Sequence, residues 1–503
     1  MKICNKILTL LLAVNLIFLT ACSNINDIVI HENTDYSQLQ EESSSYGEDF
    51  YSQELSSSSL ISLDEVISES SLNSLTSTSS NFSSKITSSN SSSKTATSSK
   101  KPSSTSSKKP SASSTKAPSS TSSKPPSSSG GSSSGYSPIY YKSPMKAVWI
   151  SQFNIADEMQ STSTAVDFRT KIANIMKTVK NFGFNTVVVQ LRPNGDAFYS
   201  SSYYPWSRYC TGTVGKAPNY DPTAILIDEA HKLGLSFHAW FNPLRLETES
   251  NMKKTSSNYK TRQWYNTKKG DYVVVVNSYC YLNPAYSEVR NLIINGAKEI
   301  ALKYNVDALH IDDYFYPTTA ASFDSIAYKN LGGTNSLAYF RRNNINILVK
   351  GIYNAVKSVN SRIKFGISPA GNINNNYNDL YADVSLWGKS SGYMDYCMPQ
   401  IYFGYNHNTL DYLKNLNQWK NTITNTNIDL VIGLAAYKIG YAQDGGSNEW
   451  SKDSTILKRQ VIDAKNGLGT KYKGFCVFSY DDLFSTNSLN TSFRNNLKQV
   501  MNG

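Results

Sequence analysis

Two adjacent carboxylates, Asp312 and Asp313, have the residue types and the surroundings to do chemistry. They stand in the run His310-Ile-Asp-Asp-Tyr-Phe-Tyr-Pro317, in which an aromatic stretch follows the acids. Cleavage of a glycosidic bond needs two carboxyl groups, one to protonate the leaving oxygen and one to act as nucleophile or to activate water. Aromatic rings such as that of Tyr314 supply flat apolar faces for sugars. The run therefore predicts a carboxylate site that hydrolyses a glycan.

The second carboxylate of such a pair is not fixed by the sequence. Asp196 lies in a loop after a predicted strand and is our first candidate for the proton donor, with Asp313 as the alternative. Either residue could instead be structural, Asp196 as a loop aspartate and Asp313 as a cap or a partner of a basic group. We expect Asp312 to be the nucleophile or a stabilising carboxylate. The other acids are weaker candidates or structural residues: Glu247, Glu249, Asp383 and Asp395.

Eight short β-rich runs have to position these residues. They alternate with longer amphipathic stretches, which is the pattern of repeated βα units and a parallel sheet. The predicted strands are Ala147–Ser151, Asn185–Arg192, Ser236–Asn242, Ala308–Tyr314, Lys364–Pro369, Asp395–Tyr402, Leu430–Tyr437 and Gly474–Tyr480. Helical periodicity is found in Asp167–Phe182, Pro222–Leu233, Ser287–Tyr304, Ala338–Val359, Tyr377–Lys389, Leu410–Asn421 and Asp453–Lys465. An α/β fold of this kind, a closed (β/α)8 TIM barrel, is therefore expected from about residue 141 to residue 503.

Strand alternation predicts which side chains point into the barrel. Residues two apart share a face, and the outer face has to be apolar to meet the helices. This places His310 and Asp312 inward. It does the same for Gln190 and Arg192 of the second strand and for His238, Trp240 and Asn242 of the third. The sixth strand also ends in polar residues, Gln400 and Tyr402, at the end of the barrel where chemistry is expected. Because Arg192 and His310 would lie beside Asp312, we expect them to keep that carboxylate ionised.

The two histidines of these strands, His238 and His310, could in principle bind a metal ion. However, no third ligand falls at a recognisable spacing from them. We therefore expect them to hydrogen-bond sugar hydroxyls or carboxylates, and we predict neither a metal nor a cofactor.

The N-terminal segment has the features of an export signal. Lys2 and Lys6 precede an apolar run that is shorter than the roughly 20 residues needed to span a bilayer. The segment ends in Leu19-Thr-Ala-Cys22, which resembles a bacterial lipobox. The resemblance implies cleavage after residue 21, lipidation of Cys22 and anchoring on the extracytoplasmic face of the cell membrane.

Residues 22–140 are dominated by Ser and Thr, with scattered Pro and Lys. Such a segment buries too little apolar surface to offset its ordering entropy, so we expect a disordered Ser/Lys/Pro-rich tether. The formal net charge of +11 does not indicate a nucleic-acid partner, because a block of lysines without acids between Lys85 and Lys124 belongs to this tether. The block is either a soluble spacer or a segment attracted to anionic wall polymers.

Four cysteines remain after the lipidation site. Cys397 and Cys476 lie in predicted strands and should be buried, inert thiols. Cys210 and Cys280 lie in predicted loops, so a disulfide between them is open for an exported protein.

The order of the motifs resembles the bacterial glycosyl hydrolase-like 10 family. The resemblance is carried by Gln190-Leu-Arg-Pro-Asn-Gly-Asp196, His238-Ala-Trp-Phe-Asn-Pro243, the His310–Pro317 run and Pro399-Gln-Ile-Tyr402, and it covers nearly all of Met145–Gly503. It implies a TIM barrel and, as for a lipoprotein of that family, cleavage of peptide-free peptidoglycan strands. It also implies that Arg192, Asp196, His238, Asn242, His310, Asp312, Asp313, Gln400 and Tyr402 line the glycan site.

A surface-anchored glycoside hydrolase that acts on a cell-wall polysaccharide is the function that we expect. The alternative is a glycan-binding lipoprotein that keeps the aromatic residues but has no productive acid pair. A purely structural spacer would leave the inward polar residues unexplained. A more distant likeness to the fourth strand of chitinase-like barrels does not favour their mechanism, because Tyr314 stands where those barrels have a glutamate.

Overall fold

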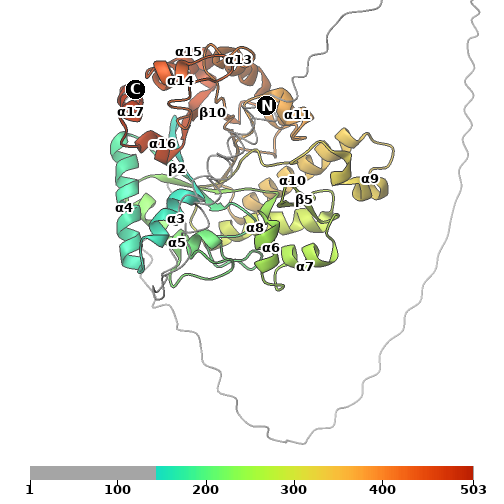
Figure 1. Ribbon diagram of the computed structural model, residues 1–503. Helices are drawn as coiled ribbons and strands as arrows, with labels where there is room; N and C mark the ends of the chain where they lie inside the picture. The colour runs from blue at the N-terminus through green and yellow to red at the C-terminus, as the bar shows by residue number, and fades with distance from the viewer. Residues whose placement is uncertain (1–142, 502–503) are drawn as a thin grey trace, which may run out of the picture. The chain divides into compact units, whose positions relative to one another are not determined.

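Eight buried β-rich runs form a closed parallel barrel. Figure 1 shows the helices that lie around it. The computed structural model describes residues 143–501, so the predicted signal segment, the tether and Cys22 lie outside the described residues. The strands pair in the order β1-β11-β10-β9-β8-β7-β3-β2, which confirms the predicted (β/α)8 fold. Their bounds are β1 Met145–Ile150, β2 Thr186–Arg192, β3 Ser236–Phe241, β7 Ala308–Ile311, β8 Lys364–Ile367, β9 Tyr396–Cys397, β10 Asp429–Ala435 and β11 Tyr472–Phe478.

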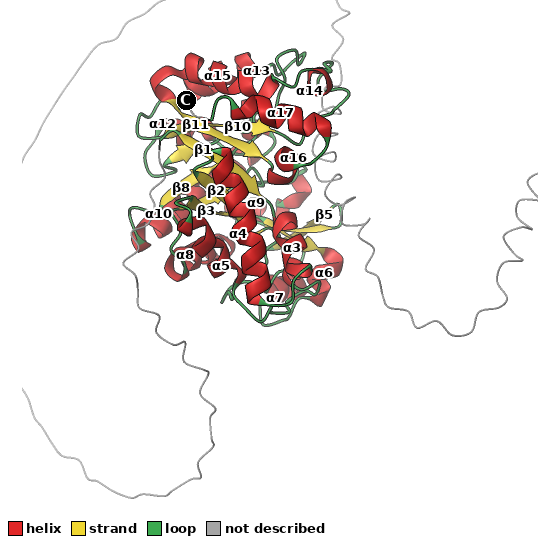
Figure 2. Ribbon diagram, turned by 90° about the vertical axis from the view of Figure 1, so that its left-hand side faces the viewer, coloured by secondary structure: helices red, strands yellow, loops and turns green. Residues whose placement is uncertain are grey.

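Helices surround the strands (Figure 2). Helix α4 illustrates why they form: Thr164 caps its first turn, Gly183 ends it with a φ of 107°, and its apolar residues recur on one face. The helices of the barrel are α3 Gln152–Gln160, α4 Ala165–Phe182, α5 Pro222–Lys232, α8 Ser287–Lys303, α9 Ser325–Leu331, α10 Leu337–Val359, α11 Ile373–Asn378, α12 Val384–Lys389, α13 Tyr412–Thr422, α14 Glu449–Lys452, α15 Ile456–Leu468, α16 Tyr480–Phe484 and α17 Ser488–Lys498. In the described part of the chain, none of them is long and apolar enough to cross a membrane.

Two apolar clusters reflect the two faces of each strand. The larger one packs the outer faces against the helices and contains Val189, Phe237 and Ile311. The smaller one fills the barrel and contains Trp149, Trp240 and Tyr396, among other residues. The alternation predicted for the third and fourth barrel strands, β3 and β7, is therefore confirmed.

One predicted helix is wrong. The stretch Tyr377–Lys389 is not continuous, because α11 ends at Asn378 and α12 begins at Val384. The Asp383 side chain accepts a hydrogen bond from the Leu386 amide and caps α12, and Tyr381 has a φ of 55°. Asp and Asn favour caps and turns over helix interiors, and in this stretch they start and stop helices rather than continue one.

An antiparallel sheet that the sequence did not predict follows β3. Its strands β4 Arg245–Thr248, β5 Val273–Val276 and β6 Tyr279–Leu282 pair in the order β4-β6-β5, with α6 Glu249–Lys254 and α7 Lys260–Thr267 between them. Cys280 lies on β6 rather than in a loop, and Cys210 and Cys280 are both buried free thiols. Cys397 and Cys476 are buried, as predicted.

Candidate active site

Asp312 lies immediately after β7, at the end of the barrel where TIM-barrel enzymes carry their active sites. Its carboxylate accepts a hydrogen bond of 2.8 Å from Trp240 Nε1 and one of 3.3 Å from the Tyr314 amide. Trp240 stands on β3, so neighbouring strands fix the orientation of this carboxylate. The Asp312 residue is 4% exposed, whereas Asp313 is half-buried. The structure therefore brings four of the candidate residues together: Asp312, Asp313, Tyr314 and Trp240.

The surroundings of Asp312 favour its protonated form. Burial, together with the negative charge of Asp313, raises the pKa of Asp312 to about 7. Arg245 and the Trp240 donor act in the opposite direction but do not outweigh burial. A carboxyl group with a pKa near 7 is suited to give a proton to a leaving group at neutral pH.

Arg245, at the start of β4, is a site residue that the sequence reasoning missed. Its Nε donates a hydrogen bond of 3.2 Å to the Pro193 carbonyl, and its guanidinium lies 4.1 Å from the centre of the Tyr314 ring. Arg245 thereby links the loop after β2 to the loop after β7, next to Asp312. The signal available in the sequence was a basic residue three positions after Asn242, at the end of a barrel strand.

A chain of amides lies on β2 and β3 at the same end of the barrel. Gln190 Oε1 accepts a hydrogen bond of 3.2 Å from the backbone N–H of Gln152, and Gln190 Nε2 donates one of 2.8 Å to Asn242 Oδ1. The Nδ2 group of Asn242 is buried and has no hydrogen-bond partner among residues 143–501. Because a buried amide donor is seldom left unpaired, Asn242 Nδ2 is a candidate donor to a ligand or a water molecule at this end of the barrel.

The predicted histidines lie deeper in the barrel. His238 Nδ1 and His310 Nδ1 lie 2.9 and 3.0 Å from the same atom, the phenolic oxygen of Tyr396. Burial lowers the pKa of His238 to about 3 and that of His310 well below its usual value, so both rings are neutral. Gly366 leaves room for the Tyr396 ring, since a Cβ at this position would lie 1.9 Å from Tyr396 Cζ. These histidines therefore contact Tyr396 rather than a carboxylate.

A further group of aromatic rings comes from β1, β11 and the segment that follows β9. Tyr402 stacks on Phe478 with centroids 6.1 Å apart and meets the edge of Trp149 at 6.5 Å. Gln400, on the same segment as Tyr402, donates a hydrogen bond of 3.0 Å to the Ser368 carbonyl. The two site residues predicted for the end of the sixth strand lie after β9, at the carboxyl end of the barrel. Tyr402 lies within the aromatic layer, and Gln400 is bonded to the residue that follows β8.

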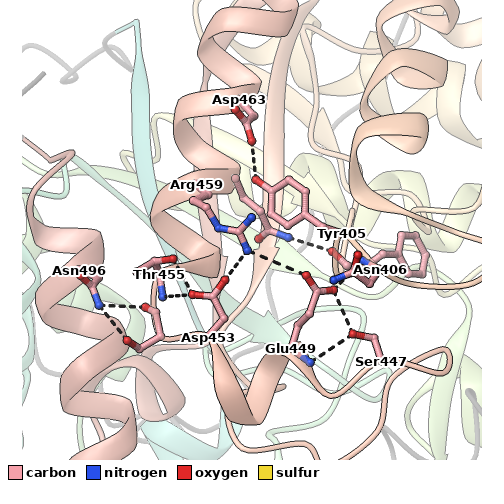
Figure 3. Close-up of polar contacts among 12 residues, drawn as sticks. Tyr405, Asn406, Ser447, Glu449, Asp453, Thr455, Arg459, Asp463 and Asn496 are labelled. Atoms are coloured by element: carbon pink, nitrogen blue, oxygen red, sulfur yellow. Dashed lines mark hydrogen bonds and ion pairs between the residues drawn. The ribbon is translucent and has the colours of Figure 1, made fainter.

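Figure 3 shows the polar network that holds the loops after β9 and β10 together. Arg459 of α15 forms ion pairs with Asp453 and Glu449, and its guanidinium lies 4.2 Å from the centre of the Tyr405 ring. Glu449 in turn accepts a hydrogen bond of 2.6 Å from the Asn406 amide, and Tyr405 donates one of 2.7 Å to Asp463. The network therefore fixes the loop that follows Tyr402.

The inward orientation predicted for Arg192 is wrong. The pairing of β2 with β3 shifts by one residue between Gln190 and Arg192, and such a bulge moves the following side chain to the other face. The Arg192 guanidinium lies between the rings of Tyr204 and Phe241, at 4.3 and 4.4 Å, on the side of helix α8. Its three nitrogens have no hydrogen-bond acceptor in the described part of the chain. Arg192 is thus separated from Asp312 by the wall of the barrel.

Asp196 lies in a different buried cluster. Its carboxylate accepts a hydrogen bond of 2.9 Å from the Asn194 amide, and burial raises its pKa. Glu247 on β4 feels the charge of Asp196, and burial together with that charge raises the pKa of Glu247 to about 7. Arg208 Nε lies 3.5 Å from Glu247. The charges that act on Asp312 come instead from Asp313 and Arg245, so the structure does not pair Asp196 with Asp312.

The described residues also bear on metal binding. Within residues 143–501, no three His, Cys, Asp or Glu side chains are grouped as a metal site would require.

The comparisons with known proteins concern most of the barrel. A family model described as Glycosyl hydrolase-like 10 matches residues 144–452. Glycosyl hydrolase YngK of Bacillus subtilis is 36% identical over 361 residues, covering 67% of this chain and 68% of the relative. Glycosyl hydrolase DigH of Escherichia coli K12 is 31% identical over 334 residues, covering 59% of this chain and 74% of the relative.

A similar solved structure is the glycoside hydrolase domain of PgaB (BpsB) from Bordetella bronchiseptica. It is 11% identical, covers 70% of this chain and 98% of that domain, and has a TM-score of 0.48. The fold is assigned from the strand pairing rather than from this likeness. The match to residues 144–452 includes Arg245, Asp312 and Asp313.

Proposed function

Because the chain belongs to the glycosyl hydrolase-like 10 family, we propose that it hydrolyses the glycan strands of peptidoglycan, with Asp312 as the proton donor. The observation that carries the role of Asp312 is its environment: a carboxyl group at a barrel strand end, held by Trp240 and Tyr314, with a pKa of about 7. The two cations that were expected to keep it ionised do not do so, since Arg192 points outward and His310 is neutral.

In the proposed reaction, the Asp312 carboxyl transfers its proton to the glycosidic oxygen as the bond from that oxygen to the anomeric carbon breaks. Asp313, whose negative charge contributes to the raised pKa of Asp312, is the partner carboxylate. It acts either as nucleophile on the anomeric carbon or as the base that takes a proton from the attacking water. If Asp313 is the nucleophile, Asp312 then takes a proton from the water that releases the sugar from Asp313, so its own proton is restored within the cycle. If Asp313 is the base, Asp313 gives the proton taken from water to solvent, and Asp312 regains one from solvent before the next turnover.

Two groups would bind the substrate. Asn242 Nδ2 is a buried donor without a partner in the described residues. The half-buried ring of Tyr314 offers an apolar face to a sugar, whereas the ring of Tyr402 is buried with one face on Phe478. Arg245 lies on Tyr314 and orients it, so we assign Arg245 as a positioning residue.

The substrate and the location rest on sequence features. The lipobox-like Leu19-Thr-Ala-Cys22 supports lipidation at Cys22 and a position on the extracytoplasmic face of the cell membrane. The family resemblance supports peptide-free peptidoglycan strands as the polysaccharide. The lysine block between Lys85 and Lys124 would attract anionic wall polymers. A Cys22→Ala variant should leave the membrane fraction; retention there would contradict the anchor.

The test is the release of reducing ends from purified peptide-free strands by the full chain and its variants. Asp312→Asn should lower kcat by roughly 10²–10⁴-fold, the usual contribution of a general acid or base, while Asp196→Asn should lower it by less than about tenfold. Asp228→Asn, on the exposed surface of α5, is the matched control. Circular dichroism verifies the fold of each variant.

Two outcomes would overturn the proposal. Full turnover by Asp312→Asn would remove Asp312 from the reaction. Binding of strands by the wild-type chain without release of reducing ends, from these strands or from chitin and plant polysaccharides, would favour the glycan-binding lipoprotein instead.

A further inference from the structure

Two adjoining hollows lie along the outside of helix α10. One is bounded by α10, α11 and α12 and has a volume of about 460 Å³; the other is bounded by α8, α9 and α10 and has a volume of about 300 Å³. Tyr339 and Asn343 line both hollows, so the two form one track, which we call the outer groove. Each hollow is of the size of a small-molecule site, about 300–1,000 Å³. A track of two such hollows suits a chain better than a single small molecule.

The outer groove follows one face of α10. Tyr339, Arg342, Asn346 and Lys350 line it and are spaced by three or four residues, so they lie on the same side of the helix. The opposite side of α10 is buried against the barrel. Since α10 follows β7, it starts at the end of the barrel that carries Asp312. The groove therefore begins near the catalytic end and runs down the outside of the molecule.

Tyrosine rings are the main apolar surface of the groove. Tyr339 is 53% exposed and Tyr377 is 41% exposed, and a third ring, that of Tyr393, is half-buried. The Arg342 guanidinium lies 3.9 Å from the centre of the Tyr377 ring and donates a hydrogen bond of 3.2 Å to the Tyr377 carbonyl. Tyr377 is thus held in place before any ligand binds. Rings with an apolar face and a hydroxyl tip match sugars, which present both C–H faces and hydroxyl groups.

Hydrogen bonds hold polar groups of the outer groove in place, and the charged groups together carry a net positive charge. Trp387 Nε1 donates a hydrogen bond of 2.6 Å to Asn346 Oδ1, so the Asn346 amide nitrogen is left to donate to a ligand. Arg342 and Lys350 contribute two positive charges, and Asp383 contributes one negative charge. One oxygen of Asp383 is already used to cap α12. The net positive charge of the outer groove favours a ligand that bears carboxylates.

We propose that the outer groove is a second glycan-binding site, which holds a carboxylate-bearing hexosamine chain outside the barrel while another part of that chain is cleaved at Asp312. The proposal rests on the proposed function for its choice of ligand, because peptide-free peptidoglycan strands carry a lactyl carboxylate on every second sugar. Tyr339 and Tyr377 stack on sugar rings, and Arg342 and Lys350 pair with the carboxylates. The site raises the local concentration of long strands and is not needed for short ones.

The test compares long and short substrates. In the full chain, Tyr339→Ala combined with Tyr377→Ala should weaken binding of labelled peptide-free strands by about tenfold, measured in the Asp312→Asn background so that the strands stay intact. Arg342→Gln should weaken binding of these strands more than binding of uncharged chitin oligomers. The controls are Leu302→Ala, which removes an exposed apolar side chain of α8, and Lys177→Gln, which removes a charge of α4.

The possible results distinguish a defect of the outer groove from a defect of the active site. In the Asp312-containing chain, the double tyrosine variant should cut long strands several-fold more slowly but should cut a trisaccharide at the wild-type rate. Unchanged binding of long strands would overturn the groove while leaving the hydrolase intact. Equal losses on long strands and on the trisaccharide would also overturn it. If the wild-type chain cuts no glycan but the tyrosine variants still lose binding, the groove stands and the hydrolase proposal fails.

Discussion

Removal of the positive charge of Arg245 should shift the pH dependence of hydrolysis toward higher pH. Arg245 lowers the pKa of Asp312, while burial and Asp313 raise it to about 7. In the Arg245→Gln variant, burial and Asp313 still raise the pKa of Asp312, and the positive charge that opposes them is absent. Because the proton donor has to be protonated, activity falls as the pH rises through the pKa of Asp312, and this alkaline limb should move upward.

The size of the shift follows from the charge that is lost. An opposite charge within about 4–6 Å lowers a carboxyl pKa by about 1–3, and the lower end applies here because burial still dominates in the wild type. The midpoint of the limb should therefore move from about 7 to about 8, which corresponds to about 1.4 kcal/mol. At pH 8 the protonated fraction of Asp312 would rise from about one in eleven to about one half, so relative activity would be about fivefold greater.

The assay is kcat/KM on a short soluble glycan between pH 5 and pH 9, since this parameter reports groups of the free enzyme. Arg245→Lys keeps the charge and should leave the limb close to its wild-type position, which separates charge from the hydrogen bond to Pro193. An alkaline limb that stays at the same pH in Arg245→Gln would refute the argument. So would a shift to higher pH of the acid limb, because it would mean that Asp312 works as an ionised nucleophile.

The two remaining predictions concern stability. Burial and Asp196 raise the pKa of Glu247 from 4.5 to about 7. The free energy of unfolding should therefore fall by about 3 kcal/mol as the pH rises between these two values, because the unfolded chain ionises Glu247 more readily. Glu247→Gln should abolish this part of the pH dependence. Urea unfolding at pH 5 and pH 8 measures it, and equal pH dependence in the variant and the wild type would contradict it. Gly366→Ala should destabilise the chain by about 3 kcal/mol or more, because the new Cβ would lie 1.9 Å from Tyr396 Cζ. Gly467→Ala, where the nearest side-chain atom is 3.5 Å away, is the matched control, and similar unfolding midpoints for the two variants would disprove the clash.

Periodicity alone predicted the barrel and the inward face of β3 and β7. It worked because Phe237, Leu309 and Ile311 alternate strictly with His238 and His310, and an uninterrupted strand preserves that alternation. It failed at Arg192, because one extra residue in β2 turns the Arg192 side chain to the outer face of the barrel. Nothing in the local sequence indicates this bulge.

The choice between Asp196 and Asp313 as the partner of Asp312 was also beyond the reach of the sequence. Asp196 follows a barrel strand, as a catalytic residue should, but its neighbour Glu247 comes from an antiparallel sheet that periodicity did not reveal. Likewise, the contact of Arg245 with Tyr314 depends on how the segment after Asn242 folds back across the end of the barrel. Residues on regular strands were predicted, and residues whose position depends on long connections were not.

The contact of two imidazoles with one phenol has a consequence for proton placement. Tyr396 has one hydroxyl hydrogen, so it can donate to His238 or to His310 but not to both, and the other ring has to carry its own hydrogen on Nδ1. The two neutral rings are therefore opposite tautomers, and a rotation of the phenol hydrogen obliges both to exchange theirs. Replacement of Tyr396 by Phe would leave both ring nitrogens without this shared partner in the interior of the barrel.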